Sequence, residues 1–385
     1  MLDTPVPIDS RLPDVGTTIF TVMSRLAQQC GAINLSQGFP DFQPDPALAA
    51  AVGEAIAAGA NQYPPMAGVP ALREAIATKL QLEYGAAYDA ESEITVTAGA
   101  TQALFTAIAA LVSPGDEVIV FEPAYDSYGP AVRLQGGVVR PVALLAPEWR
   151  PDWAAFRAAL TPRTRLVIVN TPHNPTGSAW PREDMETLAA LLDGSRVCVL
   201  ADEVYEHMVF DGRRHESVAR HPALAQRAIG VSSFGKTYHV TGWKVGYVFA
   251  PAALMAEFRK VHQFNVFTVN SPAQAAFASV AGRAETWREL AAFYQAKRDR
   301  LRSGLAASRL RLLPCAATYF QLVDYRAISD LPDVAFAEWL TREAGVAAIP
   351  ISVFSHDRAD RGIVRLCFAK QDATLDAAVA RLVCL

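Results

Sequence analysis

Short apolar runs alternate with longer segments of helical spacing from about residue 46 to about residue 290. The runs are too short for helices and are rich in Val and Ile, which is typical of buried strands. Seven of them follow one another along the chain, at 94–97, 117–121, 138–142, 166–170, 197–201, 228–232 and 245–249.

The segments between these runs place apolar residues at helical spacing, at 71–84, 101–111, 153–159 and 182–192. Strand, crossover helix and strand in turn are expected of a mostly parallel sheet with helices on its faces. We therefore predict an α/β fold with a mostly parallel, seven-stranded sheet covered by helices.

The pattern changes after about residue 285. A long amphipathic helix at 286–307 is followed by a strand at 318–323, a helix near 334–343 and a strand at 363–368. Prolines make residues 1–18 an extended arm, before a helix at 18–29. We expect a large domain at 44–285, while 1–43 and 286–385 form the arm and a small α+β domain.

Composition excludes several classes of function. The net charge is −4 and the charged residues are spread along the chain, so no surface for a nucleic-acid backbone is indicated. The five cysteines show no CxxC spacing, which argues against a disulfide framework or a zinc site and fits a reducing cytoplasm. The N-terminus lacks a signal peptide's apolar core, and no apolar run approaches the roughly 18 residues of a membrane helix. We expect a cytoplasmic protein with no metal, no nucleic acid and no membrane contact.

Polar residues follow several predicted strands at their carboxyl ends, where ligands of open α/β sheets bind. Lys236 lies after one of these runs, between Ser233 and Thr237, with Lys244 nearby. A nucleophilic lysine needs a lowered pKa and oriented neighbours. Hydroxyls and a second cation suit a phosphate-bearing aldehyde, although a lysine here can equally be a solvated surface charge.

Asp202 ends another apolar run, where an unpaired carboxylate is costly. It is either a helix cap or structural ion-pair partner, or the carboxylate that keeps a pyridine nitrogen protonated and makes the ring an electron sink. Tyr205 reaches the same ligand if this segment forms one turn. Its alternative role is that of a core residue.

Two turns and a late arginine complete the candidate site. Asn174 projects from a turn that two prolines fix. Its side chain either donates a hydrogen bond into the cleft or has a structural role in the turn. Gly99, Ala100 and Thr101 link a strand to a helix, where backbone N–H groups can hold a phosphate, unless they form only a tight turn. Arg365 lies among apolar residues and needs an anion, either a substrate carboxylate or a structural one.

Together these segments resemble the class I aminotransferases of pyridoxal-phosphate fold type I. The family's lysine signature is similar to SSFGKTYHVTGWKVGY, and its other motifs match NQYPPMAGVPALREAIA, NTPHNPTG, ADEVYEHMVF and VRLCFAK, in the family's order. The resemblance spans nearly the whole chain. The stretches INLSQGFPDF, FEPAYDSY and RLCFAK are most similar to methionine aminotransferases and kynurenine/glutamine transaminases, and TYFQLVDY and GVAAIPISVF favour the methionine group.

The resemblance implies pyridoxal 5′-phosphate as the cofactor. Lys236 would bind it as a Schiff base and later move a proton between the substrate Cα and the cofactor C4′. Asp202 would pair with the pyridine nitrogen, and Tyr205 and Asn174 with the ring oxygen. The other implied contacts are Tyr125 on the ring face, Gly99, Ala100, Thr101, Ser233 and Lys244 at the phosphate, and Tyr63 at the phosphate of a neighbouring subunit. A homodimer with shared active sites is therefore expected.

The resemblance also implies a substrate site. Arg365, Asn174 and the Gly38 backbone would bind the α-carboxylate of an amino acid. Candidates for an apolar side-chain pocket are Phe20 and Phe267, then Ile19, Phe39 and Phe354, although each can equally be a packing residue. Such a pocket suits methionine, aromatic amino acids and glutamine. Because one methylene changes binding by only about 1–3 kcal/mol, we expect broad specificity.

Two residues depart from the pattern of many class I members. Lys244 stands where many have arginine, and it keeps the charge but not the planar fork. Tyr125 replaces the tryptophan of aspartate-type members and can still stack. No second arginine is evident for a side-chain carboxylate, which argues against aspartate as the preferred substrate.

The sequence thus predicts an aminotransferase that moves an amino group between an L-amino acid, with methionine favoured, and a 2-oxo acid. The alternative enzyme is a kynurenine/glutamine transaminase with a cysteine-conjugate β-lyase side activity, which would share every cofactor residue. A regulator that kept the fold would usually carry an added DNA-binding domain, for which there is no room before Thr18.

Overall fold

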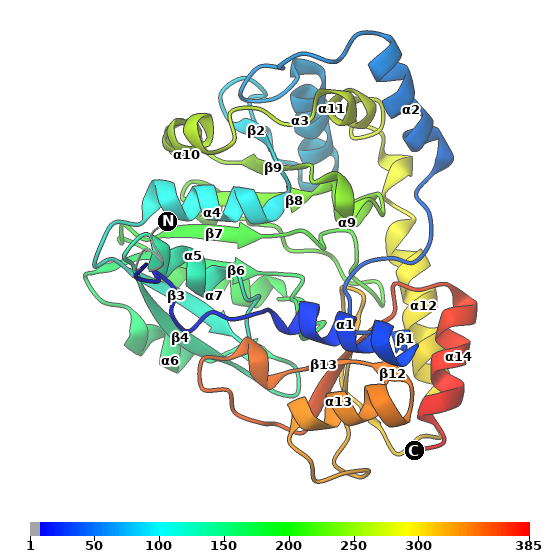
Figure 1. Ribbon diagram of the computed structural model, residues 1–385. Helices are drawn as coiled ribbons and strands as arrows, with labels where there is room; N and C mark the ends of the chain where they lie inside the picture. Colours follow the sequence, from blue (N-terminus) through cyan, green and yellow to red (C-terminus); the bar gives the residue numbers. More distant parts are fainter. Residues whose placement is uncertain (1–7) are drawn as a thin grey trace, which may run out of the picture.

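The computed structural model describes residues 8–385, so the first part of the predicted arm lies outside the described residues. Its largest feature is an eight-stranded sheet in the order β2-β9-β8-β7-β6-β3-β4-β5 (Figure 1). Seven of these strands correspond to the predicted runs: β2 (Ile94–Thr97), β3 (Glu117–Glu122), β4 (Val138–Leu145), β6 (Thr164–Asn170), β7 (Cys198–Asp202), β8 (Ala228–Ser233) and β9 (Gly246–Phe249). The eighth, β5 (Arg150–Pro151), has two residues, too few to give a periodic pattern.

The strand directions confirm the predicted mostly parallel sheet. Strands β4, β3, β6, β7 and β8 pair in parallel, whereas β9 runs antiparallel to both β8 and β2. Since the carboxyl ends of parallel strands lie at one edge, residues that follow β6, β7 and β8 come together there.

Helices cover both faces of this sheet, because its side chains alternate between two cores. Val118 and Val120 of β3 pack with α4 (Ala100–Leu111), α5 (Tyr128–Leu134) and α10 (Ala252–Asn265). Ile119 and Phe121 belong to the larger core. That core also includes residues of α3 (Pro70–Tyr84), α6 (Trp153–Ala159) and α7 (Arg182–Leu191).

The C-terminal part forms a second, antiparallel sheet in the order β10-β11-β14-β13. Its strands are β10 (Arg311–Leu312), β11 (Phe320–Asp324), β13 (Ile349–Pro350) and β14 (Ile363–Cys367). Its helices are α12 (Leu290–Gly304), α13 (Asp333–Glu343) and α14 (Asp372–Leu382). The predicted smaller α+β unit is therefore present, while the exact domain boundary stays a prediction.

The segment after the arm pairs with this second unit. Helix α1 (Ile19–Cys30) begins at Thr18, whose hydroxyl caps it, and ends at Gly31 in the left-handed region. Strand β1 (Ile33–Asn34) then pairs in parallel with β12 (Val346–Ala347). The remaining helices are α2 (Pro46–Ala57), α8 (Pro222–Ala225), α9 (Phe234–Thr237) and α11 (Ser271–Ala278), with short 3₁₀ turns at Val218–Arg220, Thr241–Trp243, Ala284–Thr286 and Ser352–Phe354.

The predicted helix at 286–307 is too long at both ends. The chain forms a 3₁₀ turn at Ala284–Thr286, and α12 begins only at Leu290, because Trp287 turns into the core with 1% of its surface exposed. The helix ends at Gly304, where α14 approaches closely. A Cβ at Gly304 would lie 2.8 Å from Val379 Cγ1.

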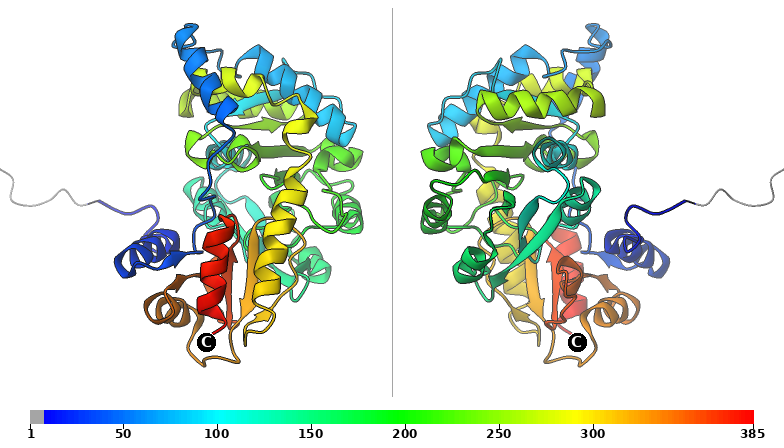
Figure 2. Two further views of the ribbon diagram at one scale, coloured as in Figure 1. Left: turned by 90° about the vertical axis from the view of Figure 1, so that its right-hand side faces the viewer. Right: turned by 90° about the vertical axis from the view of Figure 1, so that its left-hand side faces the viewer.

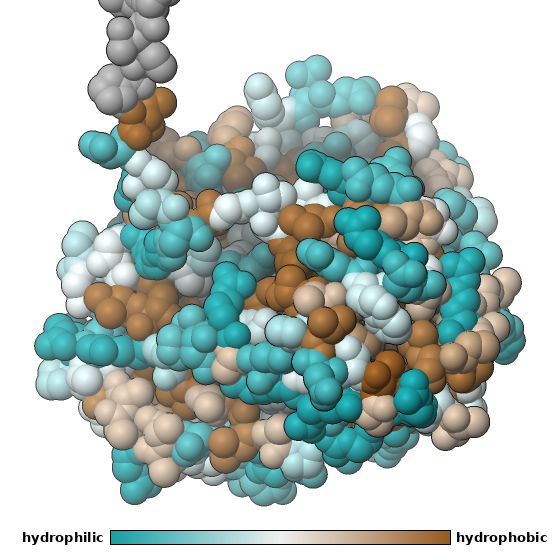
Figure 3. Space-filling model, turned by 60° about the horizontal axis from the view of Figure 1, so that its bottom comes forward, coloured by the Kyte–Doolittle hydropathy of each residue, from teal (hydrophilic) through white to brown (hydrophobic). Residues whose placement is uncertain are grey.

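Helices α12 and α14 lie side by side (Figure 2) and are joined by ion pairs, Lys297 with Asp372 and Arg300 with Asp376. On the face shown in Figure 3, apolar groups are separated by polar side chains. Among residues 8–385, none of the helices combines the length and the apolar character needed to cross a membrane.

Candidate active site

A cavity of about 180 Å³ lies at the carboxyl edge of the large sheet. Asn170, Asp202 and Ser233, the last residues of β6, β7 and β8, all line it. Ten of the residues singled out from the sequence meet there: Gly99, Ala100, Thr101, Tyr125, Asn174, Asp202, Tyr205, Ser233, Lys236 and Lys244. Leu104, Asn170, Val204, Gly235, Thr241 and Val245 complete the lining.

Lys236 reaches this cavity from α9, a single turn that begins where β8 ends. Its amine donates hydrogen bonds to the Tyr319 hydroxyl at 3.0 Å and to the Gly38 carbonyl at 3.3 Å. It forms no ion pair within residues 8–385, and burial lowers the pKa of Lys236 to about 8. A sizeable fraction of this amine is therefore neutral near physiological pH, as a nucleophile requires.

Asp202 faces the amine from the end of β7, with 4% of its surface exposed. Burial raises the pKa of its carboxyl to about 6, although a hydrogen bond from the Tyr128 hydroxyl at 2.6 Å acts in the opposite direction. Tyr128 was not among the predicted site residues. It lies three residues after Tyr125, and the two ring centroids are 5.7 Å apart. The second tyrosine of FEPAYDSY could therefore have been predicted as a site residue from its spacing to Tyr125.

The segment after Asp202 turns once, as the role of Tyr205 requires. Residue Val204 donates its backbone N–H toward the Asp202 carboxylate at 3.4 Å, and Met208 N–H bonds the Tyr205 carbonyl. Tyr205 is buried, which raises the pKa of its phenol above the usual value. The Lys236 amine lies 5.5 Å from the centre of the Tyr205 ring.

The opposite end of the cavity is formed by the start of α4. Gly99 adopts φ +76°, a backbone conformation that residues with a side chain rarely adopt, and the Lys244 amine lies within van der Waals contact of this turn. The first N–H groups of a helix have no partner within the helix. Together with Ser233 and Lys244, they make this end suitable for an anion.

Arg365 lies beside the cavity in β14, with 1% of its surface exposed. One guanidinium nitrogen donates to Asn174 Oδ1 at 2.6 Å and another to the Ser36 carbonyl at 3.1 Å. Within residues 8–385 its Nε has no hydrogen-bond partner and no carboxylate forms an ion pair with it. A buried cation that forms no direct ion pair is expected to bind an anion.

Aromatic rings surround this guanidinium. Its carbon lies 3.9 Å from the centre of the Phe320 ring, 5.4 Å from Phe20 and 5.5 Å from Phe354. Phe20 and Phe354 also contact each other at 5.9 Å between centroids. Two of the predicted pocket residues therefore lie next to the predicted carboxylate site, whereas Ile19 packs partly buried against the core.

Three other predicted residues lie outside the cavity. Tyr63 and Phe267 pair with ring centroids 5.3 Å apart and are 81% and 42% exposed. Phe39 is 45% exposed and lies over the Lys370 amine. Tyr63 was assigned to a neighbouring subunit's site, and this role stays a prediction, as does substrate contact by Phe267.

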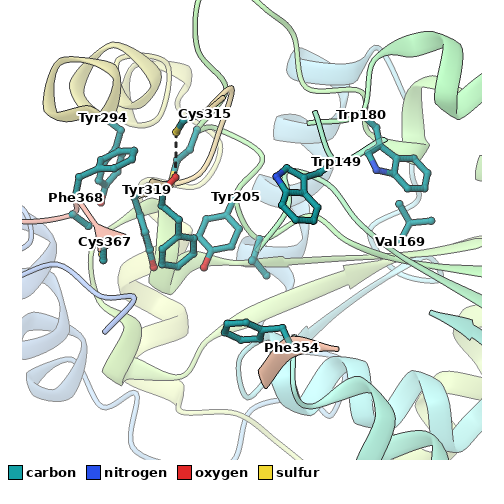
Figure 4. Close-up of a cluster of buried hydrophobic side chains, with 14 of the residues drawn as sticks. Trp149, Val169, Trp180, Tyr205, Tyr294, Cys315, Tyr319, Phe354, Cys367 and Phe368 are labelled. Carbon is teal, nitrogen blue, oxygen red and sulfur yellow. Dashed lines mark hydrogen bonds between the residues drawn. The ribbon is translucent and has the colours of Figure 1, made fainter. Parts of the chain in front are cut away.

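Tyr319 is the main residue that the sequence did not point to. Figure 4 shows it between Tyr294 and Tyr205, with the hydroxyls of Tyr319 and Tyr205 pointing to the same side. Its hydroxyl donates to the Gly38 carbonyl at 2.5 Å. A tyrosine in a predicted strand reads as a core residue, so no sequence signal distinguished it.

The family described as aminotransferase class I and II matches residues 31–382, a range that includes every cavity residue. The chain is 56% identical over 384 residues to a methionine aminotransferase of Escherichia coli (strain K12), covering 99% of each chain. A solved E. coli structure, whose study identified a methionine aminotransferase function, superposes with a TM-score of 0.97 at 56% identity, covering 99% of this chain and 100% of that one.

Two further relatives are less similar. A probable N-succinyldiaminopimelate aminotransferase of Mycobacterium tuberculosis is 40% identical over 386 residues, 97% of each chain. Human kynurenine–oxoglutarate transaminase 1 is 34% identical over 404 residues, 95% of each chain.

Proposed function

We propose, since this chain belongs to the class I and II aminotransferase family, that it is a pyridoxal-phosphate-dependent transaminase acting on L-methionine and a 2-oxo acid. The observation that carries the proposal is the meeting of Lys236 and Asp202 in one cavity, beside the unpaired Arg365. The identity of 56% to a methionine aminotransferase, against 34% to a kynurenine transaminase, supports methionine. Glutamine and aromatic amino acids remain secondary substrates in this proposal.

The cavity residues fit pyridoxal phosphate at both ends. The turn at Gly99 has φ +76° and combines the first N–H groups of α4 with Ser233 and Lys244, which suits a phosphate. The buried Asp202 lies at the other end, where a carboxylate can pair with a protonated pyridine nitrogen. Because that pairing stabilises the charged carboxylate, it would offset the effect of burial on the pKa of Asp202.

When bound, the cofactor would supply an electron-accepting ring that stabilises negative charge at the substrate Cα. Lys236 would hold it covalently and, once displaced by the amino acid, would take the α-proton with its free amine. Asp202 would keep the ring nitrogen protonated. Tyr205 and Asn174 would bind the ring oxygen, and Tyr125 would stack on the ring face.

The substrate would be oriented by its carboxylate. Arg365 has donors available for a bidentate pair, and Asn174 and the Ser36 carbonyl lie beside it. The rings of Phe20 and Phe354 form an apolar wall next to this anion site. A thioether side chain packs well against such rings, which supports methionine as the amino donor.

The proposal is tested by the visible absorption of the purified protein with pyridoxal phosphate. We expect an absorption band of lysine-bound cofactor, which L-methionine without any 2-oxo acid converts to the band of pyridoxamine phosphate. Lys236→Ala should show no lysine-bound band.

Three other results would count against the proposal in different degrees. A protein that does not take up the cofactor would contradict it entirely. A loaded protein that answers an aromatic amino acid or glutamine but not methionine would contradict only the substrate. Formation of pyruvate and a thiol from a cysteine conjugate would support the β-lyase alternative.

The proposal includes a homodimer and a cytoplasmic location. Tyr63, Phe264 and Phe267 are large and exposed, Phe264 by 91%, which supports a protein–protein contact on this surface. If Tyr63 serves the neighbouring site, inactive Lys236→Ala chains mixed with Tyr63→Ala chains should regain activity, because each hybrid dimer has one intact site. Mixed chains without any gain, or a monomer by light scattering, would contradict the shared site.

A further inference from the structure

Tyr319 joins three parts of the chain at the amine of Lys236. It lies immediately before β11 in the second sheet and is fully buried. Its hydroxyl accepts a hydrogen bond from Lys236 at 3.0 Å and donates one to the Gly38 carbonyl at 2.5 Å, and Lys236 also donates to that carbonyl. The large sheet, the segment after β1 and the second sheet therefore meet in one triangle of polar atoms.

The backbone on both sides of this triangle is specialised. Thr318, directly before Tyr319, is buried and has φ +65°, an unusual conformation for a β-branched residue. Strained residues of this kind persist where the surroundings hold them, often at functional sites. On the other side, a Cβ at Gly38 would lie 2.9 Å from Phe320 Cζ, so only glycine lets the arm approach this closely.

The strained turn presents two neighbouring side chains to two different groups. Phe320 lies under the guanidinium of Arg365 at 3.9 Å, while Tyr319 reaches Lys236. One short segment of the second sheet thus contacts both the anion site and the amine.

Resting on the proposed function of Lys236, we propose that Tyr319 is a positioning residue whose phenolic oxygen holds the Lys236 amine whenever that amine is free of the cofactor. The position matters because the free amine must take the α-proton of the bound amino acid, and proton transfer requires hydrogen-bond reach.

A phenol suits this task better than a carboxylate. Burial, together with nearby Tyr205, raises the pKa of Tyr319 well above its usual value, so the phenol stays neutral. A neutral acceptor orients the amine without adding the negative charge that would keep it protonated. The ionisable groups facing Lys236 are Asp202 at the end of β7, Tyr205 after it, Lys244, Arg365 and Cys367 of β14, and Tyr319 itself.

Tyr294 provides a matched control. It is a second fully buried tyrosine, its ring centroid is 5.6 Å from that of Tyr319, and its hydroxyl has no hydrogen-bond partner within residues 8–385. Tyr294→Phe therefore removes a hydroxyl from the same cluster without touching Lys236. Thermal unfolding of both variants shows whether either fold is disturbed.

The test labels the full-length, cofactor-free chain with trace acetic anhydride across pH and follows Lys236 by mass spectrometry. Because the hydrogen bond favours the charged amine, Tyr319→Phe should lower the Lys236 titration midpoint by roughly half to one unit. With cofactor bound, the rate constant of the single-turnover reaction of Tyr319→Phe with L-methionine should fall about tenfold, while the KM for L-methionine stays unchanged. Tyr294→Phe should change neither.

The proposal would be overturned if the Lys236 titration midpoint in Tyr319→Phe were equal to, or higher than, the midpoint in Tyr294→Phe. A wild-type midpoint near that of a solvated lysine, a result that needs no variant, would also overturn it. Since the labelling uses no cofactor, failure of the wild-type protein to bind pyridoxal phosphate would count against the proposed function alone.

Discussion

Two lysines near the large sheet, the buried Lys79 and the half-buried Lys236, have opposite surroundings. Lys79 in α3 donates to Glu206 Oε1 at 2.6 Å, and the two side chains are 3% and 2% exposed. Glu206 also accepts bonds from the hydroxyls of Tyr84, Ser232 and Tyr247. Within residues 8–385, the partners of Lys236 are a phenol and a carbonyl.

Under the proposed function, Lys79 stabilises the fold and Lys236 takes part in the chemistry. Glu206 is one residue from Tyr205 and bonds Ser232, next to Ser233, so its ion pair ties the segments that form the cavity. Burial raises the pKa of Glu206, but the Lys79 ammonium outweighs this and holds it below the usual range. Desolvation lowers the pKa of Lys236, and no carboxylate within residues 8–385 forms an ion pair with the amine to reverse this.

The largest effect expected from this comparison is on catalysis. Lys236→Met should lower the transamination rate by about 10⁴-fold or more, because it removes both the covalent attachment and the base, and a general base alone contributes about 10²–10⁴-fold. Steady-state kinetics with L-methionine measures this. Lys79→Met should retain a transamination rate within about tenfold of the wild-type rate under conditions in which the variant is folded. Equal losses of rate in the two variants would contradict the proposed difference between a structural Lys79 and a catalytic Lys236.

The next effect is on stability, where we expect the Lys79 substitution to have the larger effect and the Lys236 substitution the smaller one. Lys79→Met leaves the buried Glu206 carboxylate unpaired and should lower the free energy of unfolding by about 3–5 kcal/mol. Lys236→Met leaves no carboxylate unpaired and should change it by less than about 1 kcal/mol. Urea unfolding of the cofactor-free chains compares the two. A Lys236→Met chain as unstable as Lys79→Met would show that both lysines are structural.

A smaller effect is expected at the anion site. Arg365→Lys loses the planar fork and should raise the KM for methionine about 10- to 100-fold, equivalent to about 1.5–3 kcal/mol for a charged hydrogen bond. Arg326→Lys is the control, since the exposed Arg326 pairs with the buried Asp324 and neither residue lines the cavity. An unchanged KM in Arg365→Lys would show that Arg365 does not bind the substrate carboxylate.

The smallest effect is a pH dependence of stability. The pKa of Lys236 is about 8 when folded and that of a free lysine is 10.5, so between these values the unfolded chain binds more protons. The free energy of unfolding of the wild type, relative to Lys236→Met, should therefore rise as pH increases from 8 to 10.5. A flat or falling difference in cofactor-free chains would show that the amine is charged in the fold.

Local patterns predicted much of this structure. The seven main strands followed from short Val- and Ile-rich runs, since these residues suit buried parallel strands. Asp202 and Lys236 were found because both follow such runs, where the topology brings strand ends together. The ends of the helix predicted at 286–307 were wrong because packing of Trp287, and of α14 against Gly304, decides them.

The sequence by itself determined the strand-and-helix order, the edge of the sheet where polar residues gather, and ten residues of the cavity. Only the tertiary structure decided which groups are partners. It gave Lys79 a carboxylate and Lys236 a phenol, and it brought Tyr128 to Asp202. The physical reason is that these contacts join residues 74 to 127 positions apart in the chain, so no local spacing encodes them.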